Sequence, residues 1–232
     1  SAGQGLAGVR LALRLVEVGD LAREAPVLIR GGFGSGRITC RLLLAGGVDD
    51  GNVYFETTRG RLNMLADIIP FAHSLLRTHI REGDCVMDGT AGNGYDTLLL
   101  AQCVGGAGRV FAFDIQVAAI EATRARLAEH GLLPRVTLIQ DGHQHAAQYI
   151  RQPLRAAVFN FGYLPHGDKN ITTLPETSVA AVQAALDLLD KGGYLVVVVY
   201  HGHEAGKAEK AALLNYFAAL PARRFSVLRY GH

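Results

Sequence analysis

Cysteine is scarce in this sequence and is not arranged in pairs. The three cysteines, Cys40, Cys85 and Cys103, are odd in number and form no CxxC motif. A disulfide framework or a zinc knuckle needs paired or closely spaced cysteines, so the sequence predicts neither. Cys85 and Cys103 stand in strongly apolar runs, which indicates small buried side chains in a protein of a reducing compartment.

An excess of charge of one sign is also missing. The net charge is +2 at pH 7, whereas a duplex-binding surface requires dense clusters of Lys and Arg. Nucleic acid is therefore permitted as a partner but not demanded. No apolar run approaches the roughly 20 residues that span a bilayer, and the N-terminus lacks a charged region followed by an apolar one. We expect a cytoplasmic protein with no membrane partner.

Apolar residues make up 49% of the 232 residues, enough for a sizeable core. From about residue 62, short and nearly unbroken apolar runs alternate with amphipathic segments. Strands that are apolar on both faces belong inside a parallel sheet covered by helices, so we predict a doubly wound α/β domain over residues 61–232. The predicted strands are 85–88, 109–115, 136–141, 156–162 and 194–200, and the predicted helices are 62–80 (kinked or entered at Pro70), 96–104, 116–131, 143–150, 178–193 and 206–220.

Residues 1–60 have a different pattern, with glycine turns between candidate strands. They predict a small β-rich N-terminal extension of unknown role. Its "GGFGSGR" stretch, 31–37, has two interpretations, a phosphate contact or a flexible hairpin turn, and the general role of glycine in turns favours the second. The candidate strands are 9–18, 26–30, 37–44 and 52–58.

The stretch "DGTAGNGYDT", residues 88–97, joins the first predicted strand of the sheet to a helix. In an open parallel sheet, ligands bind at this edge, where glycines allow close approach and a helix beginning near Tyr95 presents free N–H groups. Asp88 and Asp96 flank the place of a pyrophosphate, and their charges disfavour it. An NAD-dependent dehydrogenase is therefore the weakest option. S-adenosylmethionine, which has a cationic amino-acid end and no phosphate, suits the loop better.

Two more strands end in aspartate. Asp114 ends the second strand about 20 residues after the glycine loop, the spacing at which a carboxylate accepts hydrogen bonds from ribose hydroxyls. Asp141 closes the third strand in "QDGH" and is placed to meet an adenine edge, with Gly142 and His143 beside it. Such residues also cap helices, but three successive acidic strand ends beside a glycine loop favour cofactor binding over capping alone.

The fourth strand ends in "FNFGYLPHGDK", at the expected place of a methyl acceptor. The Asn160 side chain can accept a hydrogen bond from an amine and orient its lone pair, and Phe161 or Tyr163 can stack on a base. The alternative is a simple exit from the strand with aromatic residues covering the core. Behind a cofactor loop, the pattern favours methylation of a nitrogen.

Histidines gather in the later loops. An HxH pair followed by Glu204 has the residue types of a metal site, but no HxxxH or CxxC completes a ligand set, so we predict no metal. Polar lining of the acceptor pocket is favoured, and any of these imidazoles can act as a general base that deprotonates an amine. The histidines are His143, His145, His166, His201 and His203.

Five ordered segments resemble one family: "DGTAGNGYDT", "FAFDIQ", "LIQDGH", "FNFGYLPHGDKNITTLPETS" and "YHGHEAGKAEK". They are similar to the bacterial class I methyltransferases of the YtqB-like family, labelled rRNA methylases and since assigned as tRNA 5-aminomethyl-2-thiouridine methyltransferases (MnmM). The resemblance covers roughly residues 63–230. It implies a Rossmann-like class I methyltransferase sheet, S-adenosylmethionine as donor, a uridine of the tRNA anticodon loop as acceptor, and often a homodimer.

The resemblance also implies roles by position. In the cofactor site it places Asp88, Gly89, Thr90, Ala91, Gly92, Asn93, Gly94, Asp96 and Thr97 at the methionine end, Asp114, Ile115 and Gln116 at the ribose, Asp141, Gly142 and His143 at the adenine, and Asn160 and Phe161 nearby. In the acceptor site it places Phe161, Gly162, Tyr163, Leu164, Lys169, Thr173, Tyr200 and Glu204, with Asn160, Tyr163, His201 and His203 as the candidate catalytic residues.

The sequence departs from this family in two places. The resemblance does not include residues 1–60, and the chain ends at "RYGH" where family members continue through an "NQ…PPF" segment into a last antiparallel strand. Loss of that strand would open the sheet edge and affect the pocket wall and dimer contact. Either the N-terminal strands compensate, or the sequence is truncated. Two other functions stay open: methylation of an rRNA base or small amine, and RNA binding without catalysis.

Overall fold

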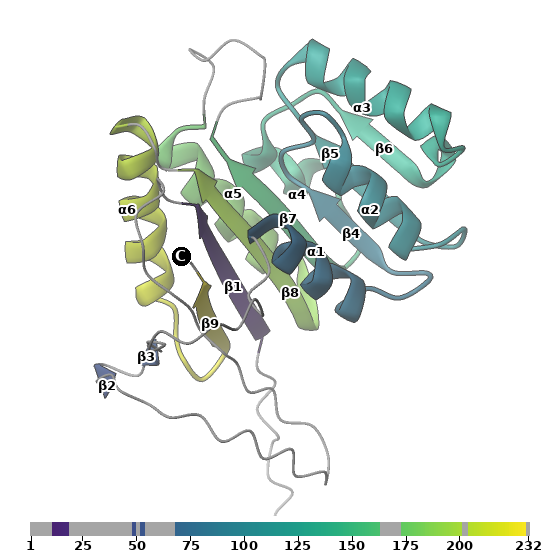
Figure 1. Ribbon diagram of the computed structural model, residues 1–232. Helices are drawn as coiled ribbons and strands as arrows, with labels where there is room; N and C mark the ends of the chain where they lie inside the picture. The colour runs from purple at the N-terminus through teal and green to yellow at the C-terminus, as the bar shows by residue number, and fades with distance from the viewer. Residues whose placement is uncertain are drawn as a thin grey trace, which may run out of the picture.

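The computed structural model describes residues 11–18, 48–49, 52–53, 68–162, 173–200 and 204–230 (Figure 1). Most of the described strands form one seven-stranded sheet in which every pairing is parallel. This confirms the predicted α/β fold class. The strands, in their order across the sheet, are β6 (Val136–Ile139), β5 (Arg109–Phe113), β4 (Cys85–Asp88), β7 (Leu154–Phe161), β8 (Leu189–Tyr200), β1 (Leu11–Val18) and β9 (Phe225–Tyr230).

Helices cover both faces of this sheet (Figure 1). One face packs against α1 (Ile68–His79), α2 (Tyr95–Cys103) and α3 (Val117–Glu129). The other packs against α4 (Ala146–Tyr149), α5 (Pro175–Leu188) and α6 (Glu204–Ala218). Two short 3-10 turns, η1 (Leu133–Arg135) and η2 (His143–His145), precede β6 and α4.

The unbroken apolar runs of the strands follow from these two covered faces. Successive side chains of a strand point to opposite faces. In β7, Val158 therefore packs into the core under α1, α2 and α3, while Ala157 and Phe159 pack into the core on the other face. Both faces therefore need apolar residues. The strand does not show the alternation of apolar and polar residues that is typical of a strand with one exposed face.

Several element boundaries differ from the prediction. Residues 189–193 were assigned to the helix before the last strand, but α5 ends at Leu188 and Leu189 begins β8. The backbone of Leu189 is extended and pairs with Leu154, so pairing across the sheet overrides the helical pattern. The strands β5 and β6 end two residues earlier than expected, and this places Asp114 and Asp141 in the loops just past them.

The predicted strand 9–18 is described at β1, and it lies within the main sheet. β1 is hydrogen-bonded to β8 on one side and to β9 on the other (Figure 1, purple). A segment from the predicted N-terminal extension thus shares a sheet with the rest of the chain. The division at residue 60 and the role of the extension stay predictions.

Little else of residues 1–67 is described. The strands β2 (Val48–Asp49) and β3 (Asn52–Val53) form a short antiparallel pair. The predicted strands 26–30 and 37–44 and the "GGFGSGR" turn, 31–37, lie outside the described residues.

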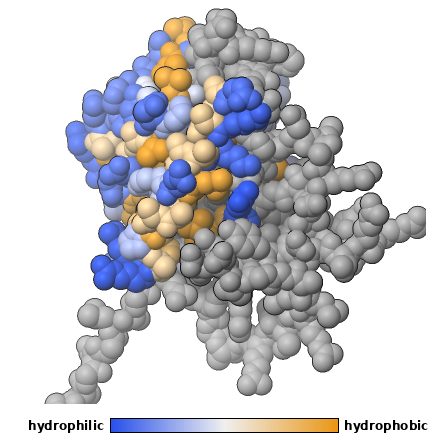
Figure 2. Space-filling view, turned by 90° about the vertical axis from the view of Figure 1, so that its left-hand side faces the viewer, coloured by the Kyte–Doolittle hydropathy of each residue, from blue (hydrophilic) through white to orange (hydrophobic). Residues whose placement is uncertain are grey.

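The molecule's surface is mixed in polarity on the side that carries α6. Figure 2 shows hydrophilic and hydrophobic residues interspersed there. Along α6, exposed Lys207 alternates with Leu213 and Phe217, which are buried against the sheet. Among the described helices, none combines the length and apolar character needed to cross a lipid bilayer.

Candidate active site

A cavity of about 990 Å³ opens at the carboxyl ends of β4, β5, β6 and β7. This is the edge at which an open parallel sheet binds ligands, and the volume is that of a small-molecule site. The loops after all four strands contribute to its wall. Of the predicted site residues, the cavity is lined by Gly89 to Asn93, Asp96, Asp114 to Gln116, Asp141 to His143, Asn160, Gly162, Thr173 and Tyr200.

The glycine loop is held by the strands on either side of β4. The Gly89 N–H donates to the Val158 carbonyl at 2.9 Å, and the Ala91 N–H donates to the Phe113 carbonyl at 2.8 Å. Gly94 has φ +80°, and a Cβ there would lie 2.9 Å from the Thr123 Cα. Glycine is therefore needed both for the left-handed turn and for the close packing of α2 on α3.

Asp88 lies behind this loop and is fully buried. Its carboxyl accepts hydrogen bonds from the Thr97 hydroxyl at 2.6 Å and from the Thr90 N–H at 3.0 Å. The prediction that two carboxylates flank the ligand therefore needs correction, because only Asp96 of the pair lines the cavity. Gly94, Thr97 and Phe161, also predicted at the site, do not line the cavity either.

Burial raises the pKa of Asp88 from 3.8 to about 7, and the charges of Asp96 and Asp114 act in the same direction. The folded protein consequently binds more protons than the unfolded chain between about pH 4 and pH 7. The free energy of unfolding should therefore fall as pH rises through this window. We expect Asp88→Asn to remove much of this dependence.

Urea unfolding of the wild type and of Asp88→Asn at pH 5, 6, 7 and 8 measures the effect. The difference in unfolding free energy between the two proteins should change steadily up to pH 7 and then level off. A constant difference across the series would contradict a raised Asp88 pKa in the folded state.

Asp114 connects two loops at the predicted ribose position. Its two carboxyl oxygens accept hydrogen bonds from the backbone N–H groups of Gly92 and Gln116, each at 2.9 Å. Each carboxylate oxygen can accept more than one hydrogen bond, so the side chain can still receive hydroxyl donors from a ligand.

The predicted adenine end combines a charged and a neutral group. Hydrogen bonds from His145 at 3.0 Å and Tyr149 at 2.7 Å lower the pKa of Asp141. The partly buried His143 donates from Nδ1 to the Gly89 carbonyl at 2.9 Å. Burial lowers the pKa of His143, which leaves a neutral ring whose Nε2 is an acceptor.

At the other end of the cavity, Asp96 links two side chains from different elements. The His73 Nε2 lies 2.5 Å from one carboxyl oxygen of Asp96, and the Asn160 side-chain nitrogen donates to the other. The Asn160 backbone N–H donates to the Thr90 hydroxyl at 2.7 Å. The Asn160 Oδ1 is buried and has no hydrogen-bond partner among the described residues.

Residues 110–232 match the family described as "Putative rRNA methylase". The match spans more than half of the sequence. The chain belongs to this family. The comparison confirms the family resemblance predicted from the five sequence segments.

Similar proteins of known structure agree with this assignment. A protein of that same description from Clostridium thermocellum has a TM-score of 0.67 at 44% identity, covering 68% of this chain and 85% of its own. SMU.1697c of Streptococcus mutans, solved in complex with SAH, has a TM-score of 0.62 at 36% identity, over 68% of this chain and 85% of its own. S-adenosylmethionine is therefore the expected cofactor of this rRNA methylase family member.

One curated relative has a named RNA substrate. It is the chloroplastic tRNA (mnm(5)s(2)U34)-methyltransferase of Arabidopsis thaliana, which is 37% identical over 160 residues. The match covers 65% of this chain and 58% of that enzyme, so the chain spans little more than half of the relative's length.

The remaining predicted acceptor residues are only partly described. The Thr173 hydroxyl accepts from the Gly162 N–H at 2.8 Å, and Tyr200 lines the cavity near Asp96. Burial and the Asp96 charge raise the pKa of Tyr200. Glu204 is exposed, is paired with Lys207 at 2.6 Å, and does not line the cavity. Six residues that the sequence analysis singled out lie outside the described residues, so their roles stay predictions: Tyr163, Leu164, His166, Lys169, His201 and His203.

Sequence reasoning missed His73, on α1. His73 and Ile69 both line the cavity. The only signal in the sequence was that His73 follows Ile69 by four residues, which places both on the same face of α1. Gln144, Leu174 and Thr177 also line it without having been predicted. Within the described ranges, no three His, Cys, Asp or Glu side chains lie close enough together to hold a metal ion.

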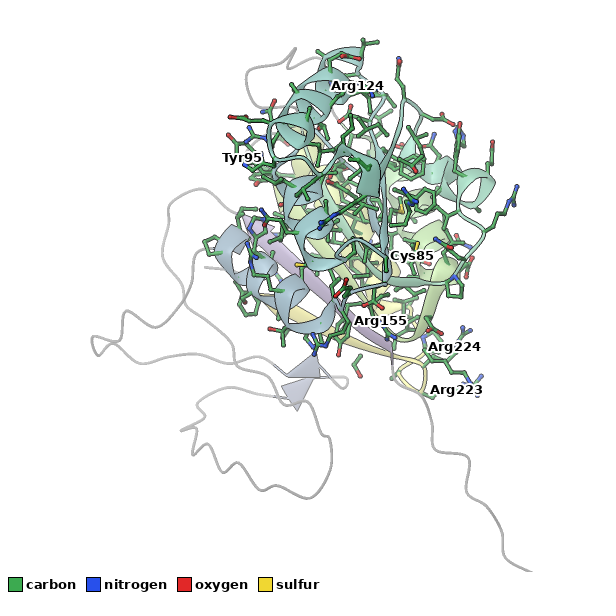
Figure 3. The ribbon with its side chains drawn as sticks, turned by 90° about the vertical axis from the view of Figure 1, so that its right-hand side faces the viewer. Cys85, Tyr95, Arg124, Arg155, Arg223 and Arg224 are labelled. Atoms are coloured by element: carbon green, nitrogen blue, oxygen red, sulfur yellow. The ribbon has the colours of Figure 1, made fainter. Side chains whose placement is uncertain are left out.

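The two described cysteines, Cys85 and Cys103, do not line the cavity. Figure 3 shows Cys85 well separated from Tyr95, which is at the rim of the cavity. Cys85 and Cys103 are both half-buried, and burial raises the pKa of each thiol. The thiols therefore stay protonated at neutral pH. The prediction of buried cysteines needs correction, because both side chains are only partly buried.

Proposed function

We propose that this protein is an S-adenosylmethionine-dependent methyltransferase that methylates an amine on RNA. The observation that carries the proposal is the buried Asn160 Oδ1, an acceptor without a partner among the described residues, beside Asp96 in the cavity. A buried acceptor of this kind is costly unless a ligand donor satisfies it. An amine N–H is such a donor.

The other half of the cavity suits the expected cofactor. Asp114 and Asp141 line it, and together with Asp96 at the acceptor end they favour a ligand that carries positive charge over a phosphate ester. The loop needs glycine at position 89, because a Cβ there would lie only 2.1 Å from the buried Phe159 ring. When bound, S-adenosylmethionine supplies a methyl group that its sulfonium sulfur has already activated.

The chain then has to orient the acceptor and keep water away. Asn160 accepts an N–H of the neutral amine, which directs the nitrogen lone pair away from Oδ1 and toward the cofactor half of the cavity. Asp96 and Tyr200 lie at the same end and add a carboxylate and a phenol ring. Most of the rate enhancement would come from positioning, because the donor needs little further activation.

The acceptor that fits best is the 5-aminomethyl group of 5-aminomethyl-2-thiouridine at the tRNA wobble position. The Arabidopsis relative, 37% identical, is named for the methylated form of this uridine. The wobble base lies in a single-stranded loop, so it can enter a pocket without the opening of a duplex. The net charge of +2 is compatible with such a small contact surface. Homodimer formation and a cytoplasmic location stay predictions.

Methyl transfer from labelled S-adenosylmethionine to two tRNA pools tests this proposal. We expect label in tRNA that carries the aminomethyl group and none in tRNA that lacks it. Equal labelling of both pools, or of neither, would overturn the tRNA assignment. If another acceptor is used, mass spectrometry of the reaction products shows which rRNA nucleoside or small amine has gained the methyl group. If calorimetry detects no binding of S-adenosylmethionine, the protein is a non-catalytic RNA-binding protein.

A further inference from the structure

His73 belongs to α1, a helix outside the five segments that carry the family resemblance. Its Nε2 lies 2.5 Å from Asp96 Oδ1, and a carboxylate has only acceptor sites, so Nε2 carries the hydrogen. Asp96 Oδ2 accepts from the Asn160 side-chain nitrogen. A continuous chain of hydrogen bonds therefore runs from His73 through Asp96 to Asn160.

This chain decides which end of the Asn160 amide faces the acceptor. An amide can present either its NH₂ group or its oxygen, depending on its rotation. With the carboxylate of Asp96 on one side, only the nitrogen can point there, because the oxygen would meet another acceptor. The oxygen is then left as the buried end, with no partner among the described residues.

The Asp96 carboxylate must itself be held for this to work. The rotation of a carboxylate about its last bond is soft, with a broad range of angles. The bond to His73 occupies one oxygen and leaves the other aligned with Asn160. The Asp96 side chain is 13% exposed and that of His73 is 26% exposed, so loss of the imidazole would admit water to a carboxylate that is now largely shielded.

We propose that His73 is a positioning residue, which holds Asp96 so that Asn160 presents its carbonyl oxygen to the acceptor amine. This inference rests on the proposed function and deepens it. It explains the selectivity for an N–H donor by the hydrogen bonds that join His73, Asp96 and Asn160. Neither His73 nor Asp96 needs to contact the transferred methyl group.

Two substitutions at His73 separate this role from proton transfer. His73→Ala should lower kcat about 10- to 100-fold, as misplaced reacting groups do, with the KM for tRNA and the affinity for S-adenosylmethionine within about threefold of the wild type. His73→Gln retains an N–H donor and should restore kcat to within about threefold. The matched control is His130→Ala, at the exposed end of α3, which should leave kcat unchanged.

The opposite outcomes are equally distinct. Wild-type kcat in His73→Ala would overturn the inference. His73→Gln that is as slow as His73→Ala, together with loss of the acidic limb of the pH profile of kcat/KM, would also overturn it and make His73 the proton acceptor.

A readout without turnover keeps this test independent of the proposed function. The side-chain amide signals of Asn160 are those lost from the ¹H–¹⁵N spectrum of Asn160→Ala. They should shift in His73→Ala, return toward their wild-type positions in His73→Gln, and stay in place in His130→Ala. If the wild type methylates no tRNA, the proposed function fails, but these signals still test the hydrogen-bond chain. Unmoved Asn160 signals in His73→Ala would overturn the positioning role of His73.

Discussion

Asn160→Ala is expected to lower kcat for methylation of aminomethyl-tRNA about 100-fold. The substitution removes the buried oxygen that would accept the amine N–H, and it leaves Asp96 without one of its two donors. The backbone N–H of Asn160 still donates to Thr90, so the loop geometry should persist. Single-turnover methyl transfer with saturating S-adenosylmethionine measures the change.

The control for this prediction is Asn215→Ala. Asn215 is an exposed asparagine on α6, so its replacement by alanine should change neither kcat nor cofactor affinity. Calorimetry should give affinities for S-adenosylhomocysteine that agree within about tenfold among the wild type, Asn160→Ala and Asn215→Ala. The Asn160 side chain would contribute at most one hydrogen bond to cofactor binding. Wild-type kcat in Asn160→Ala would remove the observation on which the proposed function depends.

Gly89→Ala is expected to have the largest effect on stability. The new Cβ would lie 2.1 Å from Phe159 Cε1, and this ring is fully buried. It has no free space to move into, because it stacks on Phe161 with 5.1 Å between centroids and meets the edge of His143 at 5.7 Å. Overpacking of this kind costs about 3 kcal/mol, which lowers the Tm by roughly 6–12 °C in a domain of this size.

The same substitution should weaken cofactor binding, because the loop that lines the cavity must move away from Phe159. Gly106→Ala is the matched control, since Gly106 is exposed and a methyl group added there would have no described atom within 4 Å. Thermal unfolding with and without S-adenosylmethionine compares the two variants. A Tm for Gly89→Ala within about 2 °C of that for Gly106→Ala would contradict the packing argument.

Much of the fold was predictable because its signals are local. The segments that form β4 and β7 are mostly apolar, without alternation of apolar and polar residues. This pattern is expected of a strand that is buried on both faces. The acidic residues after β5 and β6 were predictable as site residues because parallel strands end at a common edge, so Asp114 and Asp141 line the cavity.

Other features depend on contacts between distant residues. Asp88 and Asp96 look alike in the sequence, yet Asp88 is buried against Thr97 and Asp96 faces the cavity, because the turn between them reverses the chain. The pairing of β1 with β8 joins residues near 15 with residues near 197, and local pattern carries no information about such register.

The sequence by itself therefore determined the α/β sheet and most of the loop residues that line the cavity, because periodicity, glycine spacing and acidic strand ends are properties of short segments. Only the tertiary structure decided which carboxylates reach the cavity, and only it brought His73 to Asp96 and Asn160. The orientation of the Asn160 amide depends on hydrogen bonds among three residues, His73, Asp96 and Asn160, whose pairs stand 23 and 64 positions apart along the chain. Such an arrangement exists only when α1, the first turn of α2 and the end of β7 are packed together.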